Sequence, residues 1–217
     1  MIEVDIVEGA SDRLIADWIG QALARALGAG AGAGNGAGAV RIALPGGSTP
    51  FPILALLVER DLDWSRLVIV PTDDRDVPED HEASNTGKLR ALFEPLGARV
   101  VTLREQPGPG DTFTLVWLGM GADGHVASLF PNTDPRIDDP RGLRRVTPDP
   151  LPPEAPYDRL TLTLPALLDT EELILVMRGD DKRAVFDAAL RGENDLPIAR
   201  LLRANAGGAR RPVTCFT

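Results

Sequence analysis

The hydrophobic positions of this chain follow two patterns, short continuous apolar runs and longer stretches with helical periodicity. Continuous apolar runs of about four to eight residues are typical of strands that are buried on both faces of a parallel sheet. Residues that alternate, as in RLTLTL at 159–164, also indicate a strand. The predicted strands lie at residues 40–44, 67–70, 98–103, 113–118, 159–164, 172–177 and near 213.

The first predicted helix follows Ser11, a residue type that caps helix N-termini, and continues to Gly28. Its apolar residues recur every three or four positions, as an amphipathic helix requires. Residues 28–39 are almost entirely glycine and alanine, so we expect a flexible surface loop there. Further helices are expected from about 50 to 61, 85 to 93, 179 to 190 and 197 to 205, with a short one beginning at His125.

This alternation predicts an α/β fold with three layers, in which a mostly parallel, Rossmann-like sheet carries helices on both faces. The 217 residues are enough for one substantial core, and we expect a single domain over residues 1–217. The proline-rich and charged segment 132–156 is expected to be a long covering loop, which we hypothesise closes over a ligand.

Composition limits the class of protein and of partner. The chain is 43% hydrophobic and has no apolar run near the roughly 20 residues that span a bilayer. Its acidic N-terminus lacks the features of an export signal, so a cytoplasmic location is expected. We also expect a monomer. One cysteine, Cys215, cannot form an internal disulfide. The net charge of −9 argues against nucleic acid or an anionic membrane as a partner. A small phosphorylated ligand remains compatible, since a phosphate needs only local N–H groups and one or two cations.

The most informative stretch begins with the predicted strand 113–118 and continues into a glycine-rich turn that ends at Asp123-Gly124-His125. Gly119, Gly121 and Gly124 allow a sharp turn and a close approach to a ligand. A histidine at the carboxyl end of a parallel strand lies where open α/β sheets bind ligands, and a neutral imidazole accepts a proton near pH 7.

A second candidate is the turn Gly46-Gly47-Ser48-Thr49 between a predicted strand and a helix that begins with proline. The glycines permit the turn, while backbone N–H groups and the two hydroxyls offer donors to an anion. An ordinary turn without a ligand explains the same residues equally well.

Other polar residues follow predicted strands. Asp73-Asp74-Arg75 comes after the strand at 67–70, although a solvated turn is an equally good interpretation. Lys182 is one of two lysines, and its place in a first helical turn opposes the helix dipole, so another interaction is expected to position it. His81 is a further candidate, in the loop before the cap Ser84-Asn85.

Five blocks of this chain together resemble the 6-phosphogluconolactonase family of the glucosamine-6-phosphate isomerase-like superfamily. They occur in family order between about residues 40 and 190, and the DGHVASLFP segment is the most specific of them. The blocks are LPGGSTP (44–50), DDR with VPEDHEASN (73–85), LGMGADGHVASLFP (118–131), RLTLTLPALL (159–168) and GDDKRAV (179–185).

The resemblance implies hydrolysis of a sugar-phosphate lactone, 6-phosphogluconolactone, in the oxidative pentose phosphate route, with no metal and no organic cofactor. It assigns His125 as the general base that activates water, and Asp123 as the residue that orients the imidazole or the sugar hydroxyls. Substrate and phosphate would be held by Gly46, Gly47, Ser48, Thr49, Asp73, Arg75 and Lys182, with His81, Gly121 and Gly124 as further candidates.

The chain departs from the family pattern in three places. Asp74 stands where the family usually has glutamate, which puts its role in question. The C-terminus VTCFT does not match the family's usual aspartate-containing segment, and the glycine and alanine insertion at 28–39 is unusual.

Two alternatives predict different residues or modules. A glucosamine-6-phosphate deaminase would carry a glutamate where this chain has Phe130, and phenylalanine cannot accept a hydrogen bond from imidazole. A non-catalytic sugar-phosphate sensor would carry a nucleic-acid-binding module, for which the first 40 residues give no signal.

Overall fold

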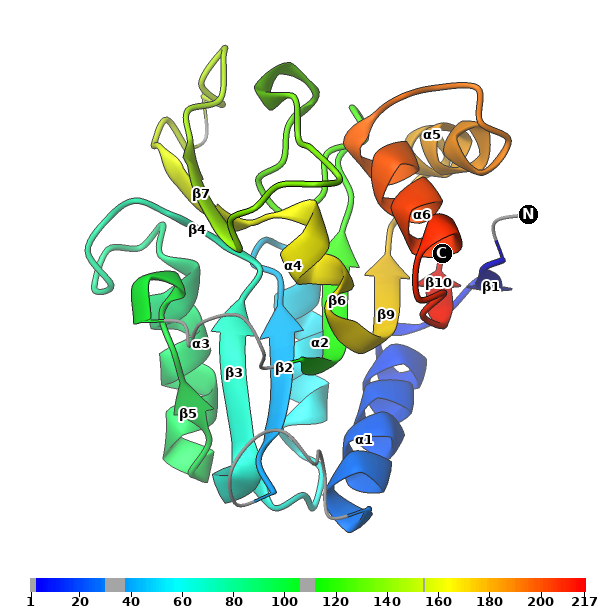
Figure 1. Cartoon of the computed structure of the whole chain (residues 1–217). Coiled ribbons are helices and arrows are strands. Elements are labelled where there is room, and N and C mark those ends of the chain that lie inside the picture. The colour runs from blue at the N-terminus through cyan, green and yellow to red at the C-terminus, as the bar shows by residue number, and fades with distance from the viewer. Residues whose placement is uncertain (1–2, 30–37, 106–111, 154) are drawn as a thin grey trace.

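The computed structural model describes residues 3–29, 38–105, 112–153 and 155–217, and its centre is a seven-stranded sheet in which every neighbouring pair is parallel (Figure 1). This confirms the predicted α/β class with a mostly parallel sheet. In spatial order the strands are β1 (Asp5–Val7), β10 (Val213–Phe216), β9 (Thr170–Val176), β6 (Phe113–Gly119), β2 (Val40–Leu44), β3 (Leu67–Pro71) and β5 (Arg99–Val100).

Helices cover both faces of this sheet because the sheet strands bury side chains on both sides. One apolar cluster joins the sheet to α1 (Asp12–Gly28), α2 (Pro50–Leu57) and α3 (Asn85–Phe93). A second cluster joins the opposite face to α4 (Leu164–Leu168), α5 (Asp180–Leu190) and α6 (Pro197–Gly207). Short 3₁₀ helices lie at Trp64–Arg66, Glu94–Leu96, Leu103–Glu105 and Pro131–Thr133.

A separate antiparallel sheet lies beyond the carboxyl ends of β2 and β3 (Figure 1). It has the order β4 (Asp73–Arg75), β8 (Arg159–Leu162), β7 (Leu143–Val146). The expectation that 132–156 is loop throughout was therefore wrong, because β7 lies within it. The sequence LRRV of β7 has little alternation, and only its pairing with β8 makes it a strand.

Several other elements differ from their predictions. His125 does not begin a helix: Val126 bridges to both Met120 and Leu129, and Ala127 has a positive φ of 49° that ends helical geometry. The helix expected to reach residue 61 ends at Leu57, and the edge strand expected at 98–103 is confined to Arg99–Val100. Most of the expected glycine and alanine loop (30–37), and the turn expected at 106–110, lie outside the described residues.

The order of the strands explains where a ligand can bind. After β2 the chain continues through α2 to β3, the neighbour of β2 on one side of the β2–β6 pair. After β6 it leads to β9, the neighbour of β6 on the opposite side. In open α/β sheets, such a change of direction leaves a crevice at the carboxyl ends of the two strands. The predicted turns after β2 and β6 both begin at this crevice.

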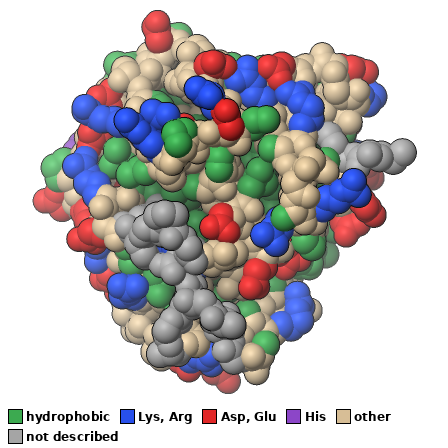
Figure 2. Space-filling model, in the orientation of Figure 1, with side chains coloured by type: hydrophobic (Ala, Val, Ile, Leu, Met, Phe, Trp, Pro, Cys, Tyr) green, Lys and Arg blue, Asp and Glu red, His purple; other side chains and the backbone are tan. Residues whose placement is uncertain are grey.

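Charged side chains are dispersed over the face shown in Figure 2, where basic and acidic groups alternate. No helix among the described residues combines the length and apolar character that a membrane span requires.

The cap of α1 gives a stability prediction. Ser11 has extended backbone, and its Oγ accepts a hydrogen bond from the N–H of Leu14 at 3.2 Å. We expect Ser11→Ala to lower the free energy of unfolding by about 1 kcal/mol, because this N–H loses its acceptor. Urea denaturation measures the change. Ser11→Asp, which keeps an acceptor, should stay near the wild type, and an equal loss in both variants would contradict the capping role.

Candidate active site

A cavity of about 270 Å³ occupies the crevice between the ends of β2 and β6. Its walls come from the turn after β2, the strand β4, the turn after β6 and the first turn of α5. Segments far apart in the sequence therefore meet at one place. The predicted residues that line it are Gly46, Gly47, Ser48, Thr49, Asp73, Arg75, Gly121, His125 and Lys182.

The turn after β2 offers open hydrogen-bond donors. Gly47 has a φ of 102°, a conformation that glycine adopts without strain. Among the described residues, the N–H groups of Gly46, Gly47 and Ser48 have no hydrogen-bond acceptor. Proline at positions 50 and 52 removes two N–H groups from the first turn of α2, so the turn itself, rather than the helix, supplies most of the donors.

His125 and Asp123 form a hydrogen-bonded pair at the end of β6. His125 Nδ1 lies 2.6 Å from Asp123 Oδ1, and the same oxygen accepts the His125 backbone N–H at 3.2 Å. A carboxylate accepts hydrogen bonds only, so Nδ1 carries the proton and Nε2 of the neutral ring is left as an acceptor. The pair therefore has the arrangement of a general base held by a carboxylate.

Close packing fixes the orientation of this pair. A Cβ atom on Gly121 would lie 2.3 Å from both Nδ1 and Cε1 of His125, so only glycine fits beside the ring. Phe130 packs on the imidazole with ring centroids 4.7 Å apart. The His125 side chain is 32% exposed, which leaves it accessible from the cavity.

The turn that carries this pair packs against the N-terminus of α6. The carbonyl oxygen of Gly124 accepts a hydrogen bond from the N–H of Ile198 at 3.1 Å. Gly124 has a φ of 76°, and a Cβ there would lie 2.8 Å from Leu196 Cδ1. Gly124 does not line the cavity; it permits the turn to lie against the N-terminus of α6.

Arg75 and Asp73 reach the cavity from β4. The Arg75 Nη1 donates to the carbonyl oxygen of Ala83 at 2.8 Å and approaches Asn85 Oδ1 at 3.5 Å. Asp73 Oδ2 accepts a hydrogen bond of 2.5 Å from Ser128 Oγ, which ties β4 to the segment after His125. Arg159 pairs with Arg75 in the register of β4 and β8, and burial, followed by repulsion from Arg75, lowers its pKa.

Lys182 lines the cavity from the first turn of α5. Its side chain is half-buried and has no ion pair with another described residue. Together with Arg75 it gives the cavity two cationic groups. An acidic chain thus carries a locally basic site, as a phosphorylated ligand would require.

One predicted residue, His81, lies away from the cavity, and two residues that were not predicted, Asn85 and Ser128, contact the cavity or its wall. His81 does not line the cavity; its Nδ1 accepts the N–H of Ala83 at 3.0 Å, and its ring packs on Tyr157. Asn85 does line the cavity, although its sequence signal was only that of a helix start. Ser128 was missed as a partner of Asp73 because nothing local indicates which carboxylate it meets.

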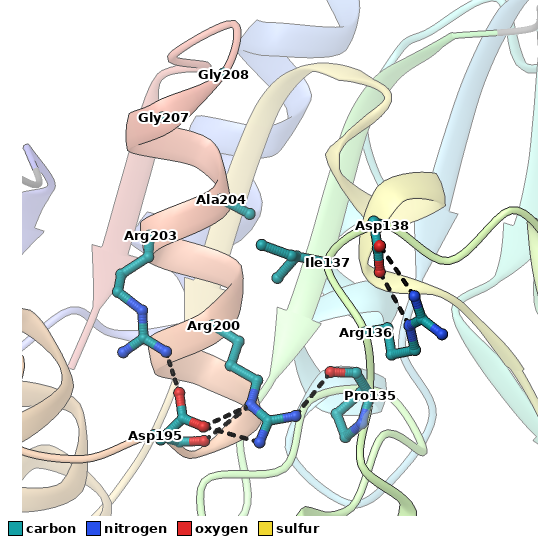
Figure 3. A pocket seen from close by; sticks show the side chains of 10 residues that line it. All are labelled: Pro135, Arg136, Ile137, Asp138, Asp195, Arg200, Arg203, Ala204, Gly207 and Gly208. Carbon is teal, nitrogen blue, oxygen red and sulfur yellow. Dashed lines mark hydrogen bonds and ion pairs between the residues drawn. The ribbon is translucent and has the colours of Figure 1, made fainter.

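A second cavity, of about 600 Å³, lies between residues 135–138 and α6 (Figure 3). Its charged groups pair with one another, since Asp195 contacts Arg200 and Arg203, and Arg136 contacts Asp138. None of the residues predicted for a site lines it. We therefore take the smaller cavity as the candidate active site.

Comparison with known families gives a match over most of the chain. The family model described as glucosamine-6-phosphate isomerases/6-phosphogluconolactonase matches residues 13–99 and 96–209. The chain belongs to this family. A 6-phosphogluconolactonase of Pseudomonas aeruginosa is 36% identical over 189 residues, covering 75% of this chain and 77% of the relative. One of Rhizobium meliloti is 32% identical and covers 88% and 89%.

Solved structures of the glucosamine-6-phosphate isomerase/6-phosphogluconolactonase family have the same fold. A 6-phosphogluconolactonase from Shewanella baltica aligns with a TM-score of 0.78 at 27% identity, covering 100% of this chain and 98% of that one. The Trypanosoma brucei enzyme aligns with a TM-score of 0.79 at 21% identity, covering 99% and 96%, which supports the fold alone.

The donor types in the cavity give no sign of a metal centre. Among residues 3–29, 38–105, 112–153 and 155–217, no group of three or more His, Cys, Asp or Glu side chains is arranged to hold a metal ion.

The two histidines should carry their protons on different nitrogens. His125 faces a carboxylate with Nδ1, whereas His81 Nδ1 accepts a backbone N–H, which leaves the proton on Nε2. Long-range ¹⁵N NMR at a pH where both rings are neutral distinguishes the tautomers. We expect Nδ1–H for His125 and Nε2–H for His81, so each ring is the control for the other. The same tautomer in both would contradict the described geometry.

The pairing also predicts the titration of Asp123. The hydrogen bond from His125 lowers the pKa of Asp123 below its ordinary value of 3.8, against the opposing effect of burial. Because the folded pKa is lowered, the stabilisation is present above the unfolded pKa and is lost as pH falls through the folded one. A ¹³C titration should give a pKa below 3.8 in the wild type, with a return toward the ordinary value in His125→Ala. An unchanged pKa in that variant would contradict the assigned cause.

Proposed function

We propose that the protein hydrolyses 6-phosphogluconolactone to 6-phosphogluconate. The observation that carries the proposal is the Asp123–His125 pair, whose histidine lines the same cavity as two cationic side chains and an open glycine-rich turn, while Asp123 itself does not line it. Family membership narrows the reaction class, since relatives at 32 to 36% identity are named 6-phosphogluconolactonases.

The reaction needs an activated water. His125 Nε2 takes a proton from water as the water oxygen attacks the lactone carbonyl carbon, and Asp123 stabilises the imidazolium that forms. The ring C–O bond then breaks, and the departing alkoxide takes the proton back from the imidazolium. The products are a carboxylic acid, which ionises, and a free hydroxyl group, so no further reactant is required.

The remaining groups bind the substrate. The open N–H groups of the turn and the hydroxyls of Ser48 and Thr49 are donors suited to phosphate oxygens. Lys182 and Arg75 add the positive charge that a dianionic phosphate requires. Asp73, an acceptor held by Ser128, is suited to sugar hydroxyl groups.

An isomerase or deaminase reaction is less well supported. In that reading a glutamate would partner the histidine from the position of Phe130, and here an aromatic ring packs on the imidazole instead. A lactone hydrolase has no need of that carboxylate, because one base suffices to activate water.

Domain organisation, oligomeric state, location and loop closure are further parts of the proposal. We propose that residues 1–217 act as a single-domain monomer in the cytoplasm. Closure of the segment 132–156 over substrate also stays a proposal; its beginning contacts α6, where Arg200 binds Asp134 Oδ1 at 2.6 Å.

Removal of the base tests the mechanism. We expect His125→Ala to reduce the enzyme-catalysed rate of lactone hydrolysis by at least about 100-fold, since general base catalysis is lost. The assay follows acid release from freshly generated 6-phosphogluconolactone, with spontaneous hydrolysis subtracted. Circular dichroism verifies that the variant is folded.

Ser11→Ala is the control, because Ser11 caps α1 and does not line the cavity. It should keep wild-type turnover. If the wild type does not exceed the spontaneous rate, the lactonase proposal fails. If His125→Ala keeps wild-type activity, the reaction stands and the role of His125 falls.

A further inference from the structure

Asp74 is a buried carboxylate that receives an unusual number of hydrogen bonds. The residue is 7% exposed. Its Oδ1 accepts the N–H groups of Asn85 at 2.6 Å and Arg75 at 2.8 Å. Its Oδ2 accepts the N–H of Thr86 at 2.9 Å, the hydroxyl of Thr86 at 2.6 Å and the hydroxyl of Ser84 at 3.3 Å.

These donors belong to two segments that both reach the cavity. Asn85 and Thr86 are the first residues of α3, where N–H groups have no partner within the helix. Arg75 is the next residue along β4. The carboxylate therefore joins the start of α3 to the strand that carries Arg75, and the positive end of the helix dipole favours its charge.

The Asn85 side chain connects the start of α3 to the residues of the cavity wall. Its Nδ2 donates to the carbonyl oxygen of Asp73 at 2.8 Å, and its Oδ1 faces the Arg75 guanidinium at 3.5 Å. The same amide packs directly on Gly46, where an added Cβ would lie 1.9 Å from Oδ1. One amide thus touches the glycine-rich turn, Asp73 and Arg75.

The other contacts of Arg75 come from the same region. Its Nη1 donates to the carbonyl oxygen of Ala83 at 2.8 Å, one residue before Ser84, whose hydroxyl contacts Asp74. Ser84 also caps α3, since its Oγ accepts the N–H of Gly87 at 3.0 Å. The position of the guanidinium therefore depends on the segment from Ala83 to Thr86, whose last three residues donate hydrogen bonds to the Asp74 carboxylate.

We propose that Asp74 is a positioning residue, which sets Arg75 and Asn85 at the wall of the cavity without touching the substrate. The proposal rests on the proposed function for the identity of the ligand, 6-phosphogluconate or its lactone. It also predicts that Asn85 is a substrate-contacting residue. His125 lies on a different turn, and none of the hydrogen bonds of Asp74 among the described residues reaches it.

The first experiment replaces the carboxylate with its neutral isostere. In Asp74→Asn one acceptor oxygen becomes an N–H₂ group that faces donors, so the start of α3 and the backbone of Arg75 shift. Calorimetry measures 6-phosphogluconate binding to the folded protein, and steady-state assays give kcat and KM. We expect affinity to fall at least about 10-fold and KM to rise by a similar factor, with a smaller change in kcat.

Ser11→Ala is the matched control, since it also removes the cap of a helix start but at α1. It should lower stability while leaving affinity and KM unchanged. Measurements are made at a temperature well below both unfolding transitions, so that loss of folded protein does not imitate loss of affinity.

A double-mutant cycle tests whether Asp74 acts through Asn85. We expect Asn85→Ala to weaken binding by itself, and Asp74→Asn to add little in that background, because the amide it positions is already absent. If the fold losses of affinity in the two single variants multiply in the double variant, Asp74 does not act through Asn85.

The outcomes separate this proposal from the proposed function. If the wild type binds 6-phosphogluconate but does not hydrolyse the lactone, the function fails and the binding data still test Asp74. If the wild type hydrolyses the lactone and Asp74→Asn binds as tightly as Ser11→Ala, the positioning role is overturned. A wild type that does not bind 6-phosphogluconate overturns it as well.

Discussion

The change of direction between β2 and β6 is the constraint on which the candidate site depends. Two parallel strands end side by side, and their continuations leave in opposite directions, so the space above their carboxyl ends stays open. The glycine turn after β2 and the turn that carries His125 both begin at that opening. Asp73 and Arg75 reach the same opening from β4, directly after β3, and Lys182 reaches it from the first turn of α5. The sheet itself is held by apolar clusters on both faces, so these strand ends are fixed by the core rather than by the polar groups of the site.

Around this opening some polar residues line the cavity, and others hold those residues in place. The Asp123–His125 pair stands on a turn fixed by Gly121, by Phe130 and by the N-terminus of α6. Arg75 stands on a different support, the antiparallel strand β4 and the start of α3, which the Asp74 carboxylate joins. The two supports meet where Ser128 binds Asp73. Because the proposed base and the proposed anion-binding wall rest on separate elements, binding and turnover are informative when they are measured independently.

Asp74, which stands where the family usually has glutamate, has a role that only its contacts reveal. The resemblance suggested that a carboxylate one methylene shorter than usual left its role in question. In the structure this side chain is buried and fully engaged with N–H groups and hydroxyls from Arg75 to Thr86. Its short reach matches donors that lie directly against its own strand.

The sequence by itself determined the elements whose signals are local. Apolar runs placed β2, β3 and β6, the caps Ser11 and Ser84 placed the starts of α1 and α3, and glycine spacing indicated the two turns of the cavity. Only the tertiary structure decided the features that depend on distant partners. The strands β4 and β7 exist because β8 pairs with them, the segment after His125 is a bridged turn rather than a helix, and His81 packs on Tyr157 instead of lining the cavity. Local sequence fixes backbone preference and burial, whereas the hydrogen-bond partner of a carboxylate, an amide or a short strand is fixed by segments brought together only when the sheet forms.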